Sequence, residues 1–237
     1  MSKLLKDSED AKKFIKKNKS LLCEKFASEK IFKPNKKPIS LFMAGSPGAG
    51  KTEYSKRFIE EFDSDIIRID ADDIREIIPQ YNGANSFVVQ GAASIGVDIL
   101  YSYVLKKRYN LLLDGTFAKF DIVYRNIERS VNKNREVAIH YIYQNPLVAW
   151  EFTKKREKIE GRNVPKEVFI KSFLDAKNNV IKIKSIFKDK VKVYLVIKDY
   201  SNNIKESYLD VHIDSYLKMK YSEEKLNKIL ENTKYEK

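Results

Sequence analysis

The sequence predicts an α/β fold with a mainly parallel sheet and helices on both faces, and three observations support this prediction. Its 237 residues are enough for one α/β domain with a full core. Short apolar runs alternate with longer helical patterns, at residues 39–44, 66–69, 111–113, 137–143 and 191–197. The first run leads directly into a glycine-rich turn. Strands and helices in this alternation are typical of a parallel sheet covered on both sides.

The composition is that of an ordinary globular protein, with 43% hydrophobic and 33% charged residues. The most apolar long segment, residues 87–105, contains Gln90 and Asp98, so we expect a buried helix there rather than a membrane span. The single cysteine, Cys23, excludes an intramolecular disulfide and a cysteine zinc cluster. The Lys-rich N-terminus lacks the apolar core of a secretory signal. We therefore expect a cytoplasmic protein with no membrane partner.

The formal net charge of +13 is compatible with binding to nucleic acid, an anionic membrane or phosphorylated small molecules. The lysines are spread from Lys3 to Lys237 rather than gathered in one block. We interpret most of this charge as solvated helix surface. No helix-turn-helix, zinc-finger or aromatic RNA-binding motif is visible, and nucleic acid is not the partner that we expect.

The first element is a helical N-terminal extension, residues 1–38, in which apolar residues recur between lysines as in an amphipathic helix. Pro34 and Pro38 end the helical pattern. We expect this extension to pack against the rest of the chain, residues 39–237. Near the other end, a polar turn at residues 201–203 predicts a C-terminal hairpin and helix within residues 190–237.

The run at residues 39–44 is followed by a phosphate-binding loop that fits the pattern G-x-x-x-x-G-K-[ST] at every position. Its residues are Gly45, Ser46, Pro47, Gly48, Ala49, Gly50, Lys51 and Thr52, with Glu53 beginning the next helix. Glycines allow the backbone N–H groups to point at phosphate oxygens, and the helix N-terminus adds positive charge. Lys51 is expected to contact the β- and γ-phosphates, and the Thr52 hydroxyl to bind Mg²⁺. The loop therefore predicts binding of ATP or GTP. A P-loop alone does not distinguish a kinase from a GTPase or a motor, and the three segments that follow are the reason to expect a P-loop kinase-like fold.

The second predicted strand ends in an acidic cluster, Ile69-Asp70-Ala71-Asp72-Asp73-Ile74-Arg75. In an extended segment Asp70 and Asp72 would project to the same side, at the strand end where ligands bind in open sheets. A carboxylate there can accept the proton of an attacking hydroxyl. The alternative is that these acids cap the following helix.

Two further segments indicate phosphoryl transfer. The run 111–113 ends in Asp114, as in the Walker B arrangement that helps to hold Mg²⁺, although an acid at a strand end is common. Residues 154–166 are expected to form a lid, because Gly161 and Pro165 separate two helices there. Arg156 and Arg162 flank this break and suit the neutralisation of phosphoryl oxygens. A basic solvated hairpin is the alternative.

In their order and spacing, these motifs resemble the zeta toxin family, the P-loop kinases of bacterial toxin–antitoxin systems. The resemblance covers residues 41–185 and rests on G-S-P-G-A-G-K-T, I-D-A-D-D-I-R, Y-N-L-L-L-D-G-T and the arginine pair followed by N-V-P-K. It implies an ATP- and Mg²⁺-dependent kinase of the sugar 3′-hydroxyl of UDP-N-acetylglucosamine or a related nucleotide-sugar. It also implies a small helical antitoxin that blocks the ATP site.

The resemblance assigns a role to each matching position. It makes Asp72 the general base, Lys51 and Thr52 the contacts to ATP and Mg²⁺, and Arg156 and Arg162 the phosphate-stabilising pair. The residues that it places on the acceptor are Arg75, Asp98, Asp114 and Thr116. Asp98 and Asp114 stand where the family has glutamates, and Ala118 stands where it usually has an arginine.

These departures concern the acceptor side of the site, so other acceptors stay open. A polynucleotide 5′-hydroxyl, which the net charge favours, or an antibiotic would keep the same fold and mechanism. A nucleotide-regulated nucleic-acid-binding protein without transferase activity is the third interpretation; its affinity for DNA would fall steeply with salt.

Overall fold

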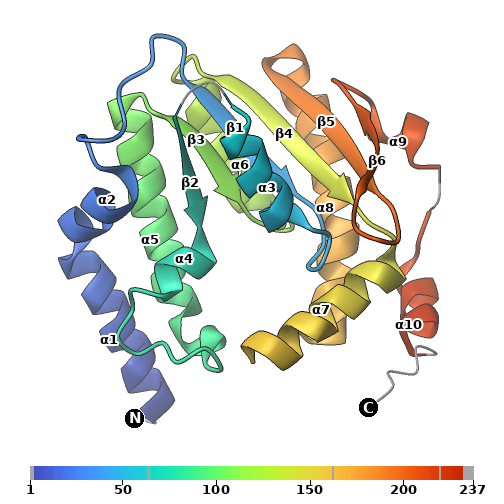
Figure 1. The fold of residues 1–237 in the computed structure, drawn as a ribbon, viewed down its shortest axis with the longest axis horizontal. Helices are drawn as coiled ribbons and strands as arrows, with labels where there is room; N and C mark the ends of the chain where they lie inside the picture. The colour runs from blue at the N-terminus through green and yellow to red at the C-terminus, as the bar shows by residue number, and fades with distance from the viewer. Residues whose placement is uncertain (1–2, 63–64, 162, 219, 232–237) are drawn as a thin grey trace.

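The computed structural model describes residues 3–62, 65–161, 163–218 and 220–231, which form a sheet flanked by helices (Figure 1). The strand order is β2-β3-β1-β4-β5-β6; neighbouring strands are parallel except for the antiparallel pair β5–β6. The strands are β1 (Ile39–Ala44), β2 (Ile66–Asp70), β3 (Asn110–Asp114), β4 (Glu136–Tyr143), β5 (Val191–Lys198) and β6 (Ile204–Tyr208). Each of the five predicted strands is confirmed to within one residue at either end.

The helices connect these strands and cover both faces of the sheet, as predicted. They are α1 (Lys3–Lys17), α2 (Lys19–Ala27), α3 (Lys51–Glu60), α4 (Ala71–Arg75), α5 (Ser86–Lys107), α6 (Phe120–Val131), α7 (Pro146–Glu160), α8 (Lys166–Phe187), α9 (Ile213–Tyr216) and α10 (Glu223–Glu231), with a 3₁₀ turn η1 (Lys188–Lys190).

Alternation of side chains along the strands divides the core into two layers. Phe42, Ile69 and Ile139 point to one face and pack with buried residues of α5, α6 and α8. Leu41 and Met43 point to the other face, where α3 supplies Tyr54 and its apolar neighbours. The central strand β1 lies between β3 and β4, so the loop that leaves its carboxyl end is flanked by the ends of both neighbours.

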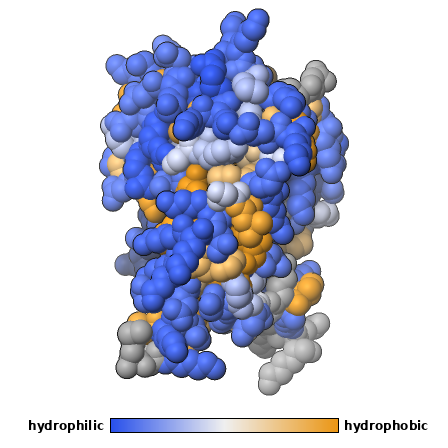
Figure 2. Space-filling view, turned by 90° about the vertical axis from the view of Figure 1, so that its left-hand side faces the viewer, coloured by the Kyte–Doolittle hydropathy of each residue, from blue (hydrophilic) through white to orange (hydrophobic). Residues whose placement is uncertain are grey.

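The N-terminal helices α1 and α2 pack against α5, as Figure 1 shows. Ala11, Ile15 and Leu22 are buried in the same cluster as the α5 core. On the outer face of these helices, Leu4, Leu5 and Leu21 are exposed. Figure 2, which views the molecule from this side, shows a mostly hydrophilic surface with a hydrophobic patch near its middle. Packing thus follows the amphipathic pattern; the division of the chain at residue 38 stays a prediction.

Helix α5 is long and apolar enough, by length and composition alone, to pass as a candidate membrane span. Half of the apolar window in this helix is buried inside the fold. Val89, Leu100 and Tyr101 belong to the main core, and Tyr101 donates a hydrogen bond from its hydroxyl to the Asn126 carbonyl at 2.6 Å. In this structure α5 acts as a core helix.

The C-terminal region forms a hairpin followed by two helices. The Asp199 carboxylate accepts hydrogen bonds from the backbone N–H groups of Ser201 and Asn203, both at 2.8 Å, and so holds the predicted turn. Helix α10 buries Leu226 and Leu230 against α7 and α8. The hairpin brings its turn back to the loop that follows β1.

Candidate active site

The loop 45–52 turns from β1 into α3 in a conformation that its glycines permit. Gly45, Gly48 and Gly50 have φ of 143°, 71° and 77°, values that favour glycine. A Cβ on Gly48 would lie 2.0 Å from the Ala149 carbonyl oxygen of α7. The backbone is therefore free to wrap a phosphate group, and α7 is held directly against the loop.

Lys51, the first residue of α3, lies inside this loop. Its ammonium group donates a hydrogen bond to the Ser46 carbonyl oxygen at 2.7 Å. Burial lowers the pKa of Lys51, and the negative charges of Asp114 and Asp70 oppose this shift. This partly buried ammonium is held by a backbone carbonyl and is well placed to exchange that partner for phosphate oxygens.

A cleft of about 390 Å³ opens above the loop, between the carboxyl ends of the strands and α7. Most of the predicted site residues line it: Pro47, Gly48, Gly50, Lys51, Thr52, Glu53, Asp72, Arg75, Asp114, Thr116 and Arg156. Ser46 and Ala49 are buried within the loop itself. Gly45 donates a backbone hydrogen bond to the Thr116 carbonyl at 3.2 Å, which joins the loop to the end of β3.

The acidic cluster after β2 differs from the expected extended segment, and that part of the prediction is wrong. Asp70 is the N-cap of α4, and its carboxylate accepts a hydrogen bond from the Asp72 N–H at 2.8 Å. A short acceptor at this position satisfies one of the free N–H groups at the start of a helix. Asp72 consequently lies in the first turn of α4 rather than on the strand, and helix capping, the alternative interpretation, applies to Asp70.

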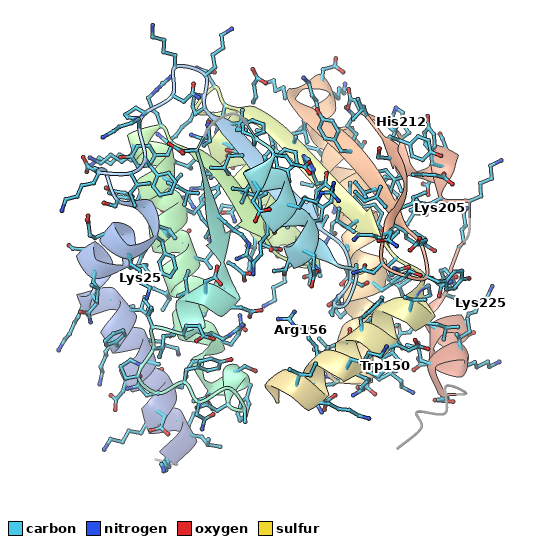
Figure 3. The ribbon with its side chains drawn as sticks, in the orientation of Figure 1. Lys25, Trp150, Arg156, Lys205, His212 and Lys225 are labelled. Carbon is cyan, nitrogen blue, oxygen red and sulfur yellow. The ribbon has the colours of Figure 1, made fainter. Side chains whose placement is uncertain are left out.

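The Asp72 carboxylate is held by arginines on both sides. Its Oδ1 is bonded to Arg75 Nη1, and its Oδ2 lies 3.6 Å from Arg156 Nη2. Arg75 is buried, and its Nη2 donates to Gln90 Oε1 of α5. Figure 3 shows Arg156 extending from α7 into the space between α7 and α4. The Asp72 carboxylate, fixed in this way, lines the cleft on the α4 side, across from α7.

Arg68, in the middle of β2, is a site residue that sequence analysis missed. Its guanidinium is bonded to the carboxylates of Asp70, Asp73 and Asp114, at 2.6 Å for Asp73 and 2.9 Å for Asp114. Nε of Arg68 also lies 3.3 Å from the hydroxyl of Ser55 in α3. Burial lowers the pKa of Arg68, but the neighbouring carboxylates outweigh it and raise the pKa above its ordinary value.

Asp70 and Asp114 are both mostly buried, with side chains 12% and 4% exposed. They are register partners at the ends of β2 and β3. Burial raises the pKa of Asp70 to about 6, Asp114 adds to the shift, and Arg68 opposes it. Asp114 Oδ2 also lies 3.1 Å from the Ser55 hydroxyl. Asp114 is thus bound inside the protein rather than projected freely into the cleft.

Of the predicted acceptor residues that the structure describes, one, Asp98, is not brought to this site. Asp98 lies on α5, and its carboxylate is 2.8 Å from Arg129 of α6. It does not line the cleft. Its assignment to the acceptor finds no support in this position. Arg162 lies outside the described residues. The break around it is confirmed, since Gly161, with φ 71°, caps α7 and α8 begins after Pro165.

Asn202, in the β5–β6 turn, also lines the cleft and was missed. A Cβ on Gly50 would lie 2.6 Å from its Oδ1. Lys198 supports the turn by donating to the Asn202 carbonyl at 2.6 Å. Strand periodicity gives no signal for such a contact, because it depends on how the hairpin folds back.

The side chains at this edge of the sheet fit a magnesium ion. Thr52 would offer its hydroxyl as the protein ligand, and the carboxylates of Asp70 and Asp114, both paired with Arg68, line the same cleft. Hard oxygen donors of this kind suit Mg²⁺, which takes most of its other ligands from phosphates and water. When bound, the ion neutralises charge on the phosphates and withdraws electrons from the transferred group.

Comparison with known proteins decides the family. The model of the zeta toxin family matches residues 24–209 of the chain, which includes the loop, the acidic cluster and the region around Arg156. This chain belongs to the zeta toxin family. Toxin PezT of Streptococcus pneumoniae is 30% identical over 149 residues, which cover 57% of this chain and 59% of that protein. The aligned region therefore spans less than two thirds of this relative.

Solved structures show the same fold in zeta toxin relatives and beyond. A structure of the PezAT chromosomal toxin–antitoxin system of S. pneumoniae matches with a TM-score of 0.69 at 20% identity, over 92% of this chain and 93% of that one. A crystal structure of AvrRxo1-ORF1 with ORF2 and ATP matches with a TM-score of 0.57 at 14% identity, over 85% and 65%. The P-loop kinase-like fold predicted from the sequence is thereby confirmed.

Proposed function

We propose that this zeta toxin family member is an ATP- and Mg²⁺-dependent kinase that phosphorylates a hydroxyl group of a soluble acceptor. The observation that carries the proposal is the Asp72 carboxylate, held between Arg75 and Arg156 on the side of the cleft opposite α7. Family membership and the intact phosphate loop support the nucleotide side of the reaction. The reaction is proposed to take place in the cytoplasm.

In this proposal each residue has a defined task. The backbone of the loop 45–52 and Lys51 bind the phosphates, and Thr52 is the protein ligand of Mg²⁺. Asp72 accepts the proton of the acceptor hydroxyl as its oxygen attacks the γ-phosphorus. Arg156 stabilises the charge on the transferred phosphoryl oxygens. Arg75 keeps the Asp72 carboxylate in place and is itself oriented by Gln90.

The acceptor that the resemblance favours is the sugar 3′-hydroxyl of UDP-N-acetylglucosamine or of a related nucleotide-sugar. Thr116 and Arg75 line the cleft where such a substrate would enter. Asp98 and Asp114 are each one methylene shorter than the glutamates that the family has at these positions. Both form ion pairs with arginines. A polynucleotide 5′-hydroxyl is the second candidate, which the net charge of +13 favours.

A transfer assay with γ-labelled ATP and Mg²⁺ tests this proposal. The acceptors are UDP-N-acetylglucosamine, other nucleotide-sugars and a 5′-hydroxyl oligonucleotide, each also run without protein. Label on UDP-N-acetylglucosamine is the expected result. Label on the oligonucleotide alone would keep the mechanism and replace the acceptor. Tight ATP binding with no transfer to any acceptor would overturn the kinase assignment.

We further propose that a small helical antitoxin restrains the enzyme by covering the cleft. The structural likeness to the PezAT toxin–antitoxin system supports a partner of this kind. Competition between the antitoxin and ATP, measured by equilibrium binding, is the expected signature.

A further inference from the structure

We propose that Arg68 is a positioning residue that acts as a built-in cation between Asp70 and Asp114, and that it makes Mg²⁺ binding depend on the nucleotide. This inference rests on the proposed Mg²⁺-dependent kinase function. It concerns the protein's own side chains at the carboxyl ends of β2 and β3, where Mg²⁺ is proposed to bind. Its test measures metal binding rather than catalysis.

The strand pattern places all three side chains on one face. Arg68 and Asp70 are two positions apart on β2 and so point to the same side, toward α3. Asp114 is the register partner of Asp70 on β3. Ile66 and Leu112 belong to the core layer under α3, which confirms the face to which these alternating positions point. The guanidinium therefore lies between two strand ends and beneath the helix that carries Thr52.

A single nitrogen atom joins the two buried carboxylates. Arg68 Nη2 is bonded to Asp70 Oδ2 and lies 2.9 Å from Asp114 Oδ2, while its Nε lies 3.3 Å from the same Asp114 oxygen. The opposite edge of the guanidinium is bonded through Nη1 to Asp73, whose side chain is 45% exposed. Arg68 itself is 13% exposed. Two carboxylates separated by one cationic nitrogen have the spacing that a divalent cation could bridge.

Charge balance explains why this position needs a cation. Two adjacent carboxylates with little exposure to water repel each other unless a positive group lies between them. Without Arg68, a divalent cation could supply that charge, since Mg²⁺ binds proteins through one or two carboxylates. With Arg68 in place the charge is already supplied. A metal ion then gains its remaining attraction from the nucleotide phosphates, at the Thr52 side of the cleft.

The sequence of this chain makes Arg68 an unusual strand residue. It stands in Ile66-Ile67-Arg68-Ile69-Asp70, where the three remaining residues before the aspartate are all isoleucines. A buried arginine in a strand is costly unless it is paired. Here every guanidinium nitrogen is directed at a carboxylate or at Ser55. The pairing keeps the Asp114 carboxylate beside Asp70, at the ends of β2 and β3, and away from the acceptor.

The test is a titration of the protein with Mn²⁺ at pH 7.5, without added nucleotide. Binding is measured as the decrease in the electron paramagnetic resonance signal of the free ion. The wild type is expected to bind Mn²⁺ weakly without nucleotide. Arg68→Met is expected to bind it about tenfold more tightly or better, because two uncompensated carboxylates then attract the ion. Arg68→Lys, which keeps a cation, should stay close to the wild type.

Two controls identify the carboxylates involved. Arg68→Met combined with Asp114→Asn should lose the gained affinity. Asp73→Asn removes the exposed partner of Arg68 but leaves the cation between Asp70 and Asp114, so its Mn²⁺ affinity should be unchanged. Should Arg68→Met fail to fold, Arg68→Gln is neutral and polar, and Mg²⁺ is expected to raise the Tm of this variant but not that of the wild type.

Equal Mn²⁺ affinity in the wild type and the neutral variants would overturn the inference, as would tight nucleotide-free binding by the wild type. Either result can occur while phosphoryl transfer is intact, and absence of transfer would leave the metal titration readable. Failure of this inference and failure of the proposed kinase function are therefore distinguishable.

Discussion

Asp72 of α4 and Arg156 of α7 face each other across the cleft, with 3.6 Å between Asp72 Oδ2 and Arg156 Nη2. The first residue follows the edge strand β2, and the second is on the helix that contacts the phosphate loop through Ala149. This pair links the two sides of the cleft. Binding of a phosphoryl group would give Arg156 a more highly charged partner and leave Asp72 open to the acceptor hydroxyl.

Replacing this arginine is expected to affect chemistry far more than nucleotide binding. Arg156→Ala should lower kcat by about 10³-fold or more, because the charge on the transferred oxygens loses its guanidinium partner. Lys158→Ala, which removes an exposed cation from the same helix, should change kcat little. Steady-state kinetics with labelled ATP measure both variants. An Arg156→Ala enzyme with normal kcat would contradict the assigned role.

The phosphate loop allows no side chain at Gly48. Gly48→Ala should destabilise the protein by about 1–3 kcal/mol and weaken nucleotide binding, because its φ of 71° is strained for alanine and the new Cβ would meet the Ala149 carbonyl. Gly115→Ala is the control, since in the described part of the chain, its own chain neighbours aside, no atom lies within 4 Å of its added Cβ. Urea unfolding of both variants compares their stability. Equal loss in the two would show that the close contact with α7 is not the cause.

The buried His140 predicts a loss of stability in acid. It lies among aromatic rings, with Nδ1 2.9 Å from the Tyr54 hydroxyl, and burial lowers its pKa from 6.5 to about 4. Between these values the unfolded chain binds a proton that the folded chain does not. The free energy of unfolding should therefore fall as pH falls through this window, by an amount on the order of 3 kcal/mol, and this group should have no effect above it.

His140→Gln isolates this contribution. Carboxylates also titrate in the same window, so the informative quantity is the difference between the wild-type and variant stability curves, each from urea unfolding at several pH values. The variant should show a shallower decline below pH 6.5. Parallel curves would mean that His140 is not the group responsible.

The N-terminal helices are expected to contribute directly to stability. Ile15→Ala should lower the free energy of unfolding by about 2–4 kcal/mol, because the side chain is buried against α5. Leu21→Ala, at an exposed position of α2, should cost about 0.5 kcal/mol or less. Deletion of residues 1–38 should lower the Tm more than either change. A truncated chain with the wild-type Tm would show that the extension serves another purpose, such as contact with an antitoxin.

Local patterns in the sequence were sufficient to predict the frame of the site. The strand at residues 39–44 and the loop after it have strong, short-range signals, namely an apolar run and glycines at fixed spacing. Gly161 and Pro165 likewise marked the break between α7 and α8. Asp72 lines the cleft, and its role as the general base stays a prediction. The helix α4 that presents it is too short to leave a periodic pattern.

What local patterns could not supply is pairing between distant segments. Asp98 turns toward Arg129 rather than the cleft because of the rotation of α5 against α6, which no motif specifies. Gln90 and Asn202 reach the site through the packing of a helix and a hairpin. Arg68 could have been suspected, since a charged residue two positions before Asp70 must share its face, but its partner on β3 depends on the strand order.

The most direct test of the central claim is the rate of phosphoryl transfer by Asp72→Asn beside the wild type, with ATP affinity measured in parallel. The amide keeps the shape of the side chain but cannot accept the proton. We predict an unchanged Kd for ATP and a kcat lower by about 10²- to 10⁴-fold. Full activity of Asp72→Asn, on an acceptor that the wild type phosphorylates, would contradict the account.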